Sequence, residues 1–309
     1  MKRRISPRKQ AGGLLTASPF LLPSLIGMLI FSVLPLIISG LISLTDWNGL
    51  AKLTDPGFLQ EHFIGLENYK ALLSDDMFRM SFRNQAVLSL FAVFNSVFFP
   101  LLAALILYHV RHKKLSRIIK TLFVIPMLVP SIVVILIWKY LYNPNFGFNS
   151  ILKLLHLGSL TQNWLNNADT ALMCIILVGF PFVSGMYFLL FHTGINSISP
   201  ELYDAARVDG ATSMDVVRYV QIPGVWPYVK IVATLSLIGS LSGFGQVAAM
   251  TAGGPGYSTM IPALQMYKVA FGDGRHGYAS ALGVVLFFVI VILTLITNKV
   301  LSGKGEKSA

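Results

Sequence analysis

Chemically active side chains are few in this chain, and residues 197 to 227 form the longest segment after residue 170 that is both polar and rich in helix signals. Acids and guanidinium groups alternate there with small residues: Glu201, Asp204, Arg207, Asp209, Asp215 and Arg218. Strongly apolar runs flank the stretch on both sides. Charged side chains held on a rigid polar segment are suited to binding another surface, so this stretch is a candidate docking loop.

The first half of the loop carries the signals of a short helix. Ser199 is a favoured N-cap residue, and Pro200 then takes the first helical position, where a missing N–H costs nothing. Glu201 and Asp204 fall in the first turns, where the helix dipole favours acids. Gly210 can end the helix in the left-handed conformation.

The second half restarts a helix after that glycine. Thr212 and Asp215 have the spacing of a capping box, with Asp in place of the usual Glu. Pro223 and Pro227 are expected to end the polar module. The sequence therefore predicts two short helices joined by a glycine bend.

The composition places this loop in a membrane protein. The chain has 309 residues, of which 54% are hydrophobic and 12% charged, with a formal net charge of +11. A soluble domain carries roughly 25% charged residues. The basic residues lie beside apolar runs, so membrane orientation explains them better than nucleic-acid binding. The single cysteine, Cys174, excludes a disulfide framework and a cysteine-rich metal site.

Six apolar runs are long enough to cross a bilayer as helices. They cover about 18–44, 85–108, 118–140, 171–192, 227–250 and 278–300. The first follows a basic N-terminus but is too long for a signal-peptide core and lacks a small-residue cleavage site, so we expect an uncleaved span. The prediction is an all-α membrane protein of one domain, residues 1–309, with six transmembrane helices.

Charge predicts the orientation of these spans. Of the 24 Lys and Arg residues, 15 lie in the N-terminal segment, the 109–120 segment, the 193–226 loop and the tail. The positive-inside rule then places both termini, and the 193–226 loop, in the cytoplasm.

The sequence lacks the motifs of several energy-coupling and catalytic mechanisms. The one Gly-Lys pair, Gly303-Lys304, is not part of a P-loop, so the chain does not bind ATP by that motif. The span interiors hold almost no ionisable groups, which disfavours a proton-driven carrier and leaves sodium coupling open. No metal site, metalloprotease or hydrolase signature is present, so we expect a non-catalytic subunit.

Spans four and five contain small and polar residues. Ser236, Gly239 and Ser240 have spacings typical of close helix packing, and a polar lining for an uncharged ligand is the alternative. Gly185 and Tyr187 in span four, and Phe244 in span five, would suit stacking against a sugar face.

The loop resembles the conserved cytoplasmic loop of the permease subunits of binding-protein-dependent ABC importers. Their pattern is Glu-Ala-Ala, three residues, Gly, nine residues, then Ile-x-Leu-Pro. This chain has Asp204-Ala205-Ala206, then Gly210, then Val220-Gln221-Ile222-Pro223 in the same register. Asp for Glu, Val for Ile and Ile for Leu are the departures, and each keeps charge or shape.

Other motifs resemble the carbohydrate-uptake, maltose-type branch of that family. They are Phe63-Ile64-Gly65-Leu66-Glu67-Asn68-Tyr69, Trp138-Lys139 with Asn143-Pro144-Asn145-Phe146-Gly147, Thr251-Ala252-Gly253-Gly254-Pro255 with Ser258-Thr259, and Gly277-Tyr278-Ala279-Ser280-Ala281. The resemblance covers nearly the whole chain.

This resemblance implies a type I ABC importer permease in a bacterial or archaeal plasma membrane. The loop would be a coupling helix docked on a separate ATPase, through Glu201, Asp204, Ala205, Ala206, Asp209, Gly210, Ala211 and Pro223. The substrate path would include Gly185, Tyr187, Phe188, Ser236, Gly239, Ser240 and Phe244.

The implied partners are a second permease, expected to be a different chain, two copies of the ATPase, an extracytoplasmic solute-binding protein and membrane lipid. This chain would bind no cofactor, and ATP and Mg would lie on the ATPase. The implied cargo is a sugar or oligosaccharide, with a polyol, glycerophosphodiester or peptide as alternatives. An ion-coupled secondary carrier is the alternative from another class.

Overall fold

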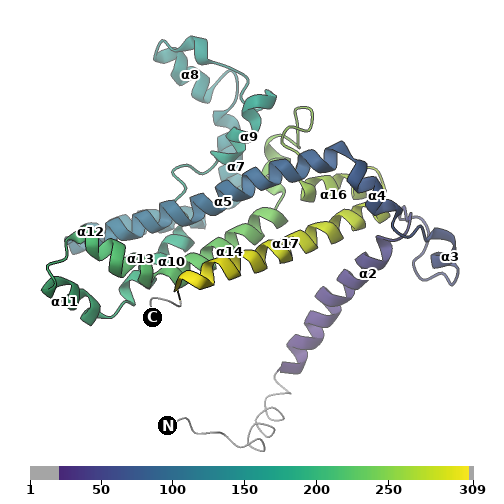
Figure 1. Ribbon diagram of the computed structural model, residues 1–309. Helices are drawn as coiled ribbons and strands as arrows, with labels where there is room; N and C mark the ends of the chain where they lie inside the picture. The colour runs from purple at the N-terminus through teal and green to yellow at the C-terminus, as the bar shows by residue number, and fades with distance from the viewer. Residues whose placement is uncertain (1–20, 306–309) are drawn as a thin grey trace, which may run out of the picture. The chain divides into compact units, whose positions relative to one another are not determined.

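The structure, a computed structural model, describes residues 21–305, which are mostly helical (Figure 1). Within this range the only strand-like pairing is an isolated bridge between Thr45 and Phe63. The described chain divides into two units, residues 21–72 with Lys268–Val284, and residues 73–267 with those from 285 on. The predicted all-α class is therefore confirmed.

The first unit begins with an apolar helix, Leu21–Ile42, which contains a π-helical segment, Leu29–Val33, and α2, Leu34–Ile42. The short helices α3 (Phe58–His62) and α4 (Glu67–Ser74) follow. The expected first span starts at 18, so its first three residues lie outside the described range.

A buried amide fixes the turn after α2. Asn68 donates from Nδ2 to the carbonyl oxygens of Ser43, at 2.9 Å, and Thr45, at 2.8 Å. Gly277 lies against the same turn, where an added Cβ would be 2.0 Å from the Thr45 carbonyl oxygen. Only glycine fits there, so the turn and the start of the last helix are closely packed.

The second unit is built around a long helix, α5 (Asp76–His109), which packs against α10 and α14. Its other helices are α6 (Lys113–Val124), α7 (Ser131–Leu141), α8 (Gly147–Leu154), α9 (Ala168–Ile176), α10 (Gly185–Asn196), α11 (Pro200–Val208), α12 (Ser213–Asp215), α13 (Ile222–Gly224), α14 (Trp226–Ser242) and α15 (Gly245–Met250). α16 (Pro262–Phe271) and α17 (His276–Gly305) each begin in one unit and end in the other. Short 3-10 turns cover Ile125–Leu128 and Gly158–Leu160, and Val216–Gln221 is π-helical.

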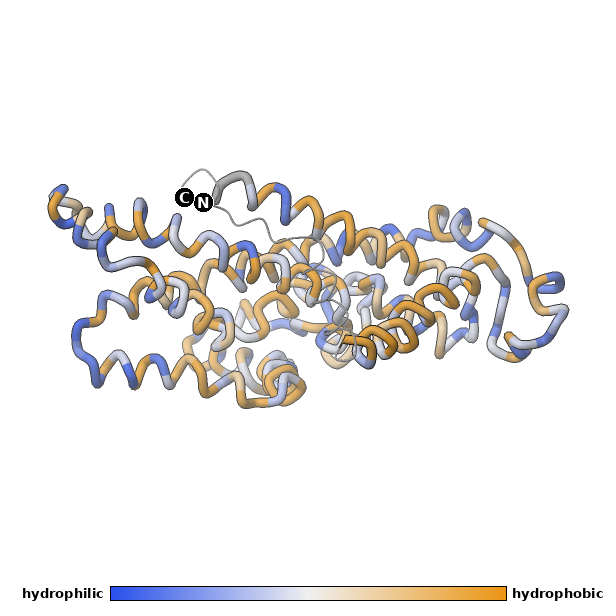
Figure 2. Tube along the Cα trace, turned by 90° about the horizontal axis from the view of Figure 1, so that it is seen from below, coloured by the Kyte–Doolittle hydropathy of each residue, from blue (hydrophilic) through white to orange (hydrophobic). Residues whose placement is uncertain are grey.

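Apolar residues follow the helices and hydrophilic ones gather in the connections (Figure 2). Three described helices are long and apolar enough to cross a membrane: Leu21–Ile42, Asp76–His109 and His276–Ser302. Two bent pairs raise the number to five, Lys113–Leu128 with Ser131–Leu141 at 91° and Ser213–Gly224 with Trp226–Ser242 at 60°.

The predicted fourth run, 171–192, is not one continuous helix. α9 ends at Ile176 and α10 starts at Gly185, with an irregular segment between them. Gly179 has φ of +88°, and Pro181 has no N–H to donate, so an α-helix does not continue there. The predicted fifth run, 227–250, is interrupted in the same way at Gly243 and Phe244, between α14 and α15.

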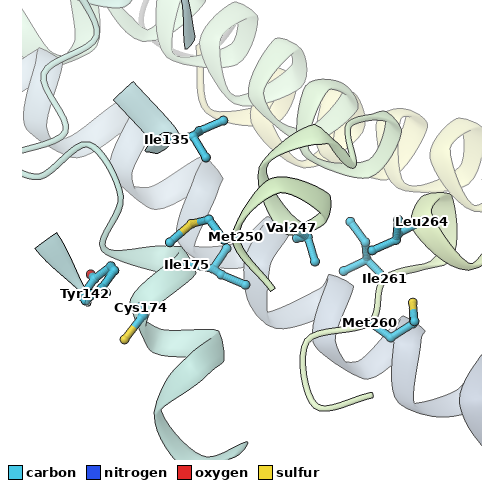
Figure 3. Packing of buried hydrophobic residues seen from close by; sticks show 9 residues of the cluster. All are labelled: Ile135, Tyr142, Cys174, Ile175, Val247, Met250, Met260, Ile261 and Leu264. Carbon is cyan, nitrogen blue, oxygen red and sulfur yellow. The ribbon is translucent and has the colours of Figure 1, made fainter. Parts of the chain in front are cut away.

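Two apolar clusters hold the second unit together. One combines α7, α9, α15 and α16 with the segment before α16, and includes Ile135, Cys174, Val247 and Leu264 (Figure 3). The other joins α5, α10 and α14 around Phe188, Phe191 and Val232. The two interrupted helices therefore have their halves anchored in different clusters.

Candidate functional site

The loop between α10 and α14 has the two helical segments that the sequence predicts (Figure 1). Ser199 precedes α11 and Pro200 is in its first turn. The Ser199 hydroxyl does not cap the helix but donates to the Glu201 carboxylate, which holds the pKa of that carboxyl below its usual range.

Gly210 makes the turn between the two segments. Its φ is +76°, and an added Cβ would meet nothing within 4 Å. The Ala211 N–H donates to the Ala206 carbonyl oxygen at 2.9 Å, a bond that closes the end of α11. The need for glycine here is conformational and not steric.

The second segment begins with a complete capping box. The Asp215 N–H donates to Thr212 Oγ1 at 3.3 Å, and the Thr212 N–H donates to Asp215 Oδ2 at 2.9 Å. The hydrogen bonds from Thr212 lower the pKa of the Asp215 carboxyl. Asp thus replaces Glu in this role.

The end of the second segment differs from the prediction. Pro223 does not end the helix, which continues through the π-helical residues Val216–Gln221 to Gly224. In a π segment the hydrogen bonds are respaced, so a residue without an N–H can be accommodated. The break comes at Val225, and Pro227 lies in the first turn of α14.

The loop exposes five of the eight residues predicted to dock. Glu201, Asp204, Ala205, Asp209 and Gly210 are exposed, whereas Ala206, Ala211 and Pro223 are half-buried. Asp204 forms an exposed ion pair with Arg207 at 2.9 Å. Apolar side chains that the sequence reasoning did not select lie beside them, namely Leu202, Val208 and Met214, with Val208 88% exposed. The sequence could have indicated these three residues, because each is a large apolar residue in an otherwise polar loop.

The opposite side of the loop is packed onto the helices. Tyr203 stacks on Tyr108 of α5 with ring centroids 5.5 Å apart, and burial raises the pKa of its hydroxyl to about 12. The Tyr203 hydroxyl also donates to the carbonyl oxygen of Ile195, in α10, at 3.4 Å. Within the loop, a Cβ on Gly224 would lie 2.6 Å from Ile198 Cδ1. The loop is thus fixed on one side and exposed on the other.

A cavity of about 560 Å³ lies where the fourth and fifth predicted runs are interrupted. Its walls are α5, the ends of α9 and α14, the 178–184 segment and the starts of α10 and α15. The lining residues that carry polar groups or lack a side chain are Asn95, Ser96, Gly179, Ser184, Tyr187, Ser236, Gly239, Ser240, Gly243, Gly245 and Gln246. None of the described lining residues is Asp, Glu, Lys, Arg or His.

Four of the seven predicted path residues line this cavity: Tyr187, Ser236, Gly239 and Ser240. The other three do not. A Cβ on Gly185 would be 2.8 Å from the Phe123 carbonyl oxygen, and Phe188 is fully buried against Phe123, so both serve helix packing. Phe244 stacks on Tyr267 with ring centroids 5.2 Å apart.

Sequence reasoning missed a polar row on α5. Gln85, Ser89 and Ser96 lie along it at intervals that place them on one helix face, and Asn95 lies beside Ser96. Ser96 Oγ accepts from Ser236 at 2.9 Å, and Gln85 Nε2 donates to the Ser240 carbonyl oxygen at 3.0 Å. Polar residues recurring at this spacing in an apolar run were the signal that could have revealed the row.

The other motif residues stabilise connections. Lys139 donates from Nζ to the Ala249 carbonyl oxygen at 2.6 Å, which joins α7 to α15. The Thr251 and Thr259 hydroxyls are 2.7 Å apart and close the turn that contains Gly253-Gly254-Pro255. Within residues 21–305 no three His, Cys, Asp or Glu side chains group as metal ligands.

The family model of the binding-protein-dependent transport system inner membrane component matches residues 96–304. This chain belongs to that family. A probable ABC transporter permease protein of Pyrococcus horikoshii is 32% identical over 278 residues, which are 89% of this chain and 92% of the relative. The family match confirms the ABC permease resemblance, and the chain is an inner membrane transport subunit.

Two further relatives and a solved structure are similar along most of the chain. The multiple sugar-binding transport system permease protein of Streptococcus mutans is 30% identical over 93% of this chain and 95% of its own. The diacetylchitobiose uptake system permease protein of Streptomyces coelicolor is 31% identical over 85% of this chain and 76% of its own. A bacterial ABC transporter involved in the import of the acidic polysaccharide alginate has the same fold, with a TM-score of 0.79 and 22% identity, covering 95% of this chain and 97% of that one.

Proposed function

We propose that this permease translocates a sugar or oligosaccharide, using energy from a separate ATPase docked on the 199–223 loop. The main evidence for a sugar as the transported molecule is the cavity at the two helix breaks. It is lined by hydroxyl, amide and aromatic groups, and its described lining has no charged side chain. Interrupted helices bracket substrate sites in many transporters, because free backbone groups at the breaks can contact the ligand. The names of the Streptococcus and Streptomyces relatives support the same class of cargo.

The proposed coupling surface is the exposed side of α11 and the Gly210 turn. Ala205 lets a partner approach closely, Asp204 and Asp209 offer carboxylates, and Val208 supplies an apolar contact. Because the other side is packed on α5 and α10, a force applied to the loop moves those helices as rigid bodies. The ATPase, with its ATP and Mg, is a separate chain in this proposal, and this subunit is not catalytic.

The remaining partners follow from the same mechanism. A second permease, expected to be a different chain, completes the path, and an extracytoplasmic binding protein delivers the ligand. Both termini and the 193–226 loop then lie in the cytoplasm, as the distribution of Lys and Arg predicts.

The test is uptake by the assembled complex in proteoliposomes that contain ATP, with binding protein added outside. Labelled maltotriose, an arabinotriose and diacetylchitobiose serve as neutral probes, and trigalacturonate as an acidic one. We expect uptake of at least one sugar that requires the ATPase, the binding protein and this chain together. Uptake by this chain alone, driven by an ion gradient, or uptake of peptides or glycerophosphodiesters only, would contradict the proposal.

A further inference from the structure

Most polar side chains that line the cavity already have hydrogen-bond partners. Ser236 Oγ donates to Ser96 Oγ at 2.9 Å, and the Ser240 and Ser89 hydroxyls are 3.1 Å apart. Gln246 Nε2 donates to the Ile175 carbonyl oxygen at 2.7 Å. These groups join α5 to α14 and α15 to α9, so their hydrogen-bonding capacity is largely used within the protein.

Asn95 and Tyr187 are different, as is the smaller Ser184 before α10, whose hydroxyl does not cap that helix. Among the described residues, neither the Asn95 amide nor the Tyr187 hydroxyl has a hydrogen-bond partner, and neither is shut away from the cavity surface. An Asn amide offers two N–H donors and a carbonyl acceptor, and a Tyr hydroxyl can donate and accept. Two unused groups of this kind, on different walls, can receive the hydroxyls of one ligand.

Aromatic rings complete the lining around these two groups. Phe91 on α5 and Phe182 in the 178–184 segment line the same cavity. Aromatic faces favour the C–H side of a sugar ring, whose hydroxyls then point outward to polar partners. Since the described lining has no cation, it offers no counter-charge to a carboxylate brought into it.

We propose that Asn95 of α5 and Tyr187 of α10 are the specificity-determining pair of this chain and hydrogen-bond the hydroxyls of a neutral, polyhydroxylated ligand. This inference rests on the proposed function and changes which residues are assigned as substrate contacts. Ser236 and Ser240, selected from the sequence as substrate contacts, hold α14 against α5. Asn95, which lies on a helix outside spans four and five, contacts the cargo.

The first test replaces Asn95 with Leu, which has a similar size and forms no hydrogen bond, in the assembled complex. The probe is whichever neutral oligosaccharide the wild-type complex transports fastest. Loss of one hydrogen bond worth about 0.5–1.5 kcal/mol predicts a fall of roughly twofold to thirteenfold in uptake rate. Asn95→Gln retains the amide and is expected to recover part of the rate. Asn298→Leu makes the same change on α17 away from the cavity and is expected to leave uptake unchanged.

The second test detects binding without transport. Cys174 is the only cysteine of the chain, so Cys174→Ala provides a background without thiols. Asn95→Cys and Tyr187→Cys in this background are expected to react with a water-soluble thiol reagent. The same oligosaccharide should slow both reactions at least threefold. Lys114→Cys, at an exposed position of α6 that does not line the cavity, should react and show no protection.

The outcomes separate the two proposals. Wild-type complexes that import none of the four probe sugars would overturn the proposed function, and this inference with it. Full-rate uptake by Asn95→Leu, or labelling at 95 that the sugar does not slow, would overturn the Asn95 assignment alone. Preferential import of trigalacturonate would overturn the neutral ligand class.

Discussion

Gly210 shows how one residue can determine the shape of a docking surface. Its φ of +76° is unfavourable for residues with a Cβ, and the space around it is open. Gly210→Ala should therefore cost about 1 kcal/mol in the turn without any clash. Asn tolerates this region better than Ala, so Gly210→Asn is the matched control.

The measurements are ATPase co-purification and ATP-driven uptake. We expect both to fall in Gly210→Ala and more in Gly210→Val, and to be largely kept in Gly210→Asn. Equal loss in the Ala and Asn variants would mean that docking depends on the absence of a side chain and not on the turn.

Asp215 gives the second segment of the loop a defined pH dependence. Its pKa is lowered because the ionised carboxylate accepts hydrogen bonds from Thr212. The folded state therefore favours the charged form, and the stabilisation is complete above the pKa of the unfolded carboxyl. It is lost as the pH falls through the lowered folded-state pKa.

Amide hydrogen exchange at residues 213–216 measures this effect. Protection is expected to be constant near neutral pH and to fall only in acid. Thr212→Ala should have lower protection at neutral pH and a smaller acid-dependent change. If the pH profile of that variant were unchanged, the capping box would not be the cause of the acid-dependent loss of protection.

At the scale of elements, the turn after α2 depends on one amide. Asn68 is buried, and its two N–H groups satisfy two carbonyl oxygens in the turn. Asn68→Ala leaves these carbonyls unpaired, which should destabilise the first unit by about 1–3 kcal/mol. Asn48→Ala removes an exposed acceptor that bonds only the Leu50 N–H, and serves as the control.

Thermal unfolding of the purified chain in detergent provides the measurement. The midpoint should fall for Asn68→Ala and stay nearly constant for Asn48→Ala. A similar midpoint for both variants would show that water replaces the amide in the turn.

Local signals predicted the helices of the loop, but the helix ends in the membrane-spanning runs were harder to place. Gly210 and Thr212 act through neighbours in sequence, so their roles could be read directly, whereas Ser199 precedes α11 without capping it through its hydroxyl. The start of α5 could not be predicted in this way. The helix begins at Asp76, where Asp75 caps it by accepting a hydrogen bond from the Met77 N–H, whereas the apolar run begins only at residue 85. Hydropathy finds the apolar part of a helix and misses its polar end.

The helix breaks and the cavity depend on contacts between distant residues. Pro181 and Gly243 were visible in the sequence, yet such residues are tolerated inside membrane helices when neighbours satisfy the freed groups. Whether Ser236 faced a ligand or a helix depended on Ser96, 140 residues away. The sequence therefore predicted that small and polar residues lie near the cavity. It could not predict which of them line the cavity and which pack between helices.

At the scale of the whole molecule, the lack of ionisable groups in the cavity gives a prediction about energy coupling. The described lining has no Asp, Glu, Lys, Arg or His side chain that could take up and release a proton near physiological pH. Sugar uptake by the complete complex should therefore persist when an ionophore removes the proton and sodium gradients. It should stop when ATP is replaced by a non-hydrolysable analogue, and an ionophore-sensitive rate would point to a carrier mechanism.

The two helix breaks also have a consequence for electrical insulation. Backbone N–H and C=O groups freed at 177–184 and 243–244 need water or another polar partner, since unsatisfied groups are costly in hydrocarbon. A hydrated pocket within the span shortens the dielectric barrier against inorganic ions. Leu88, Val183 and Leu235 on its wall are among the apolar groups that can keep the pocket from becoming a continuous water column. Resistance to ion leak at this depth then depends on a few side chains and not on the thickness of the bilayer.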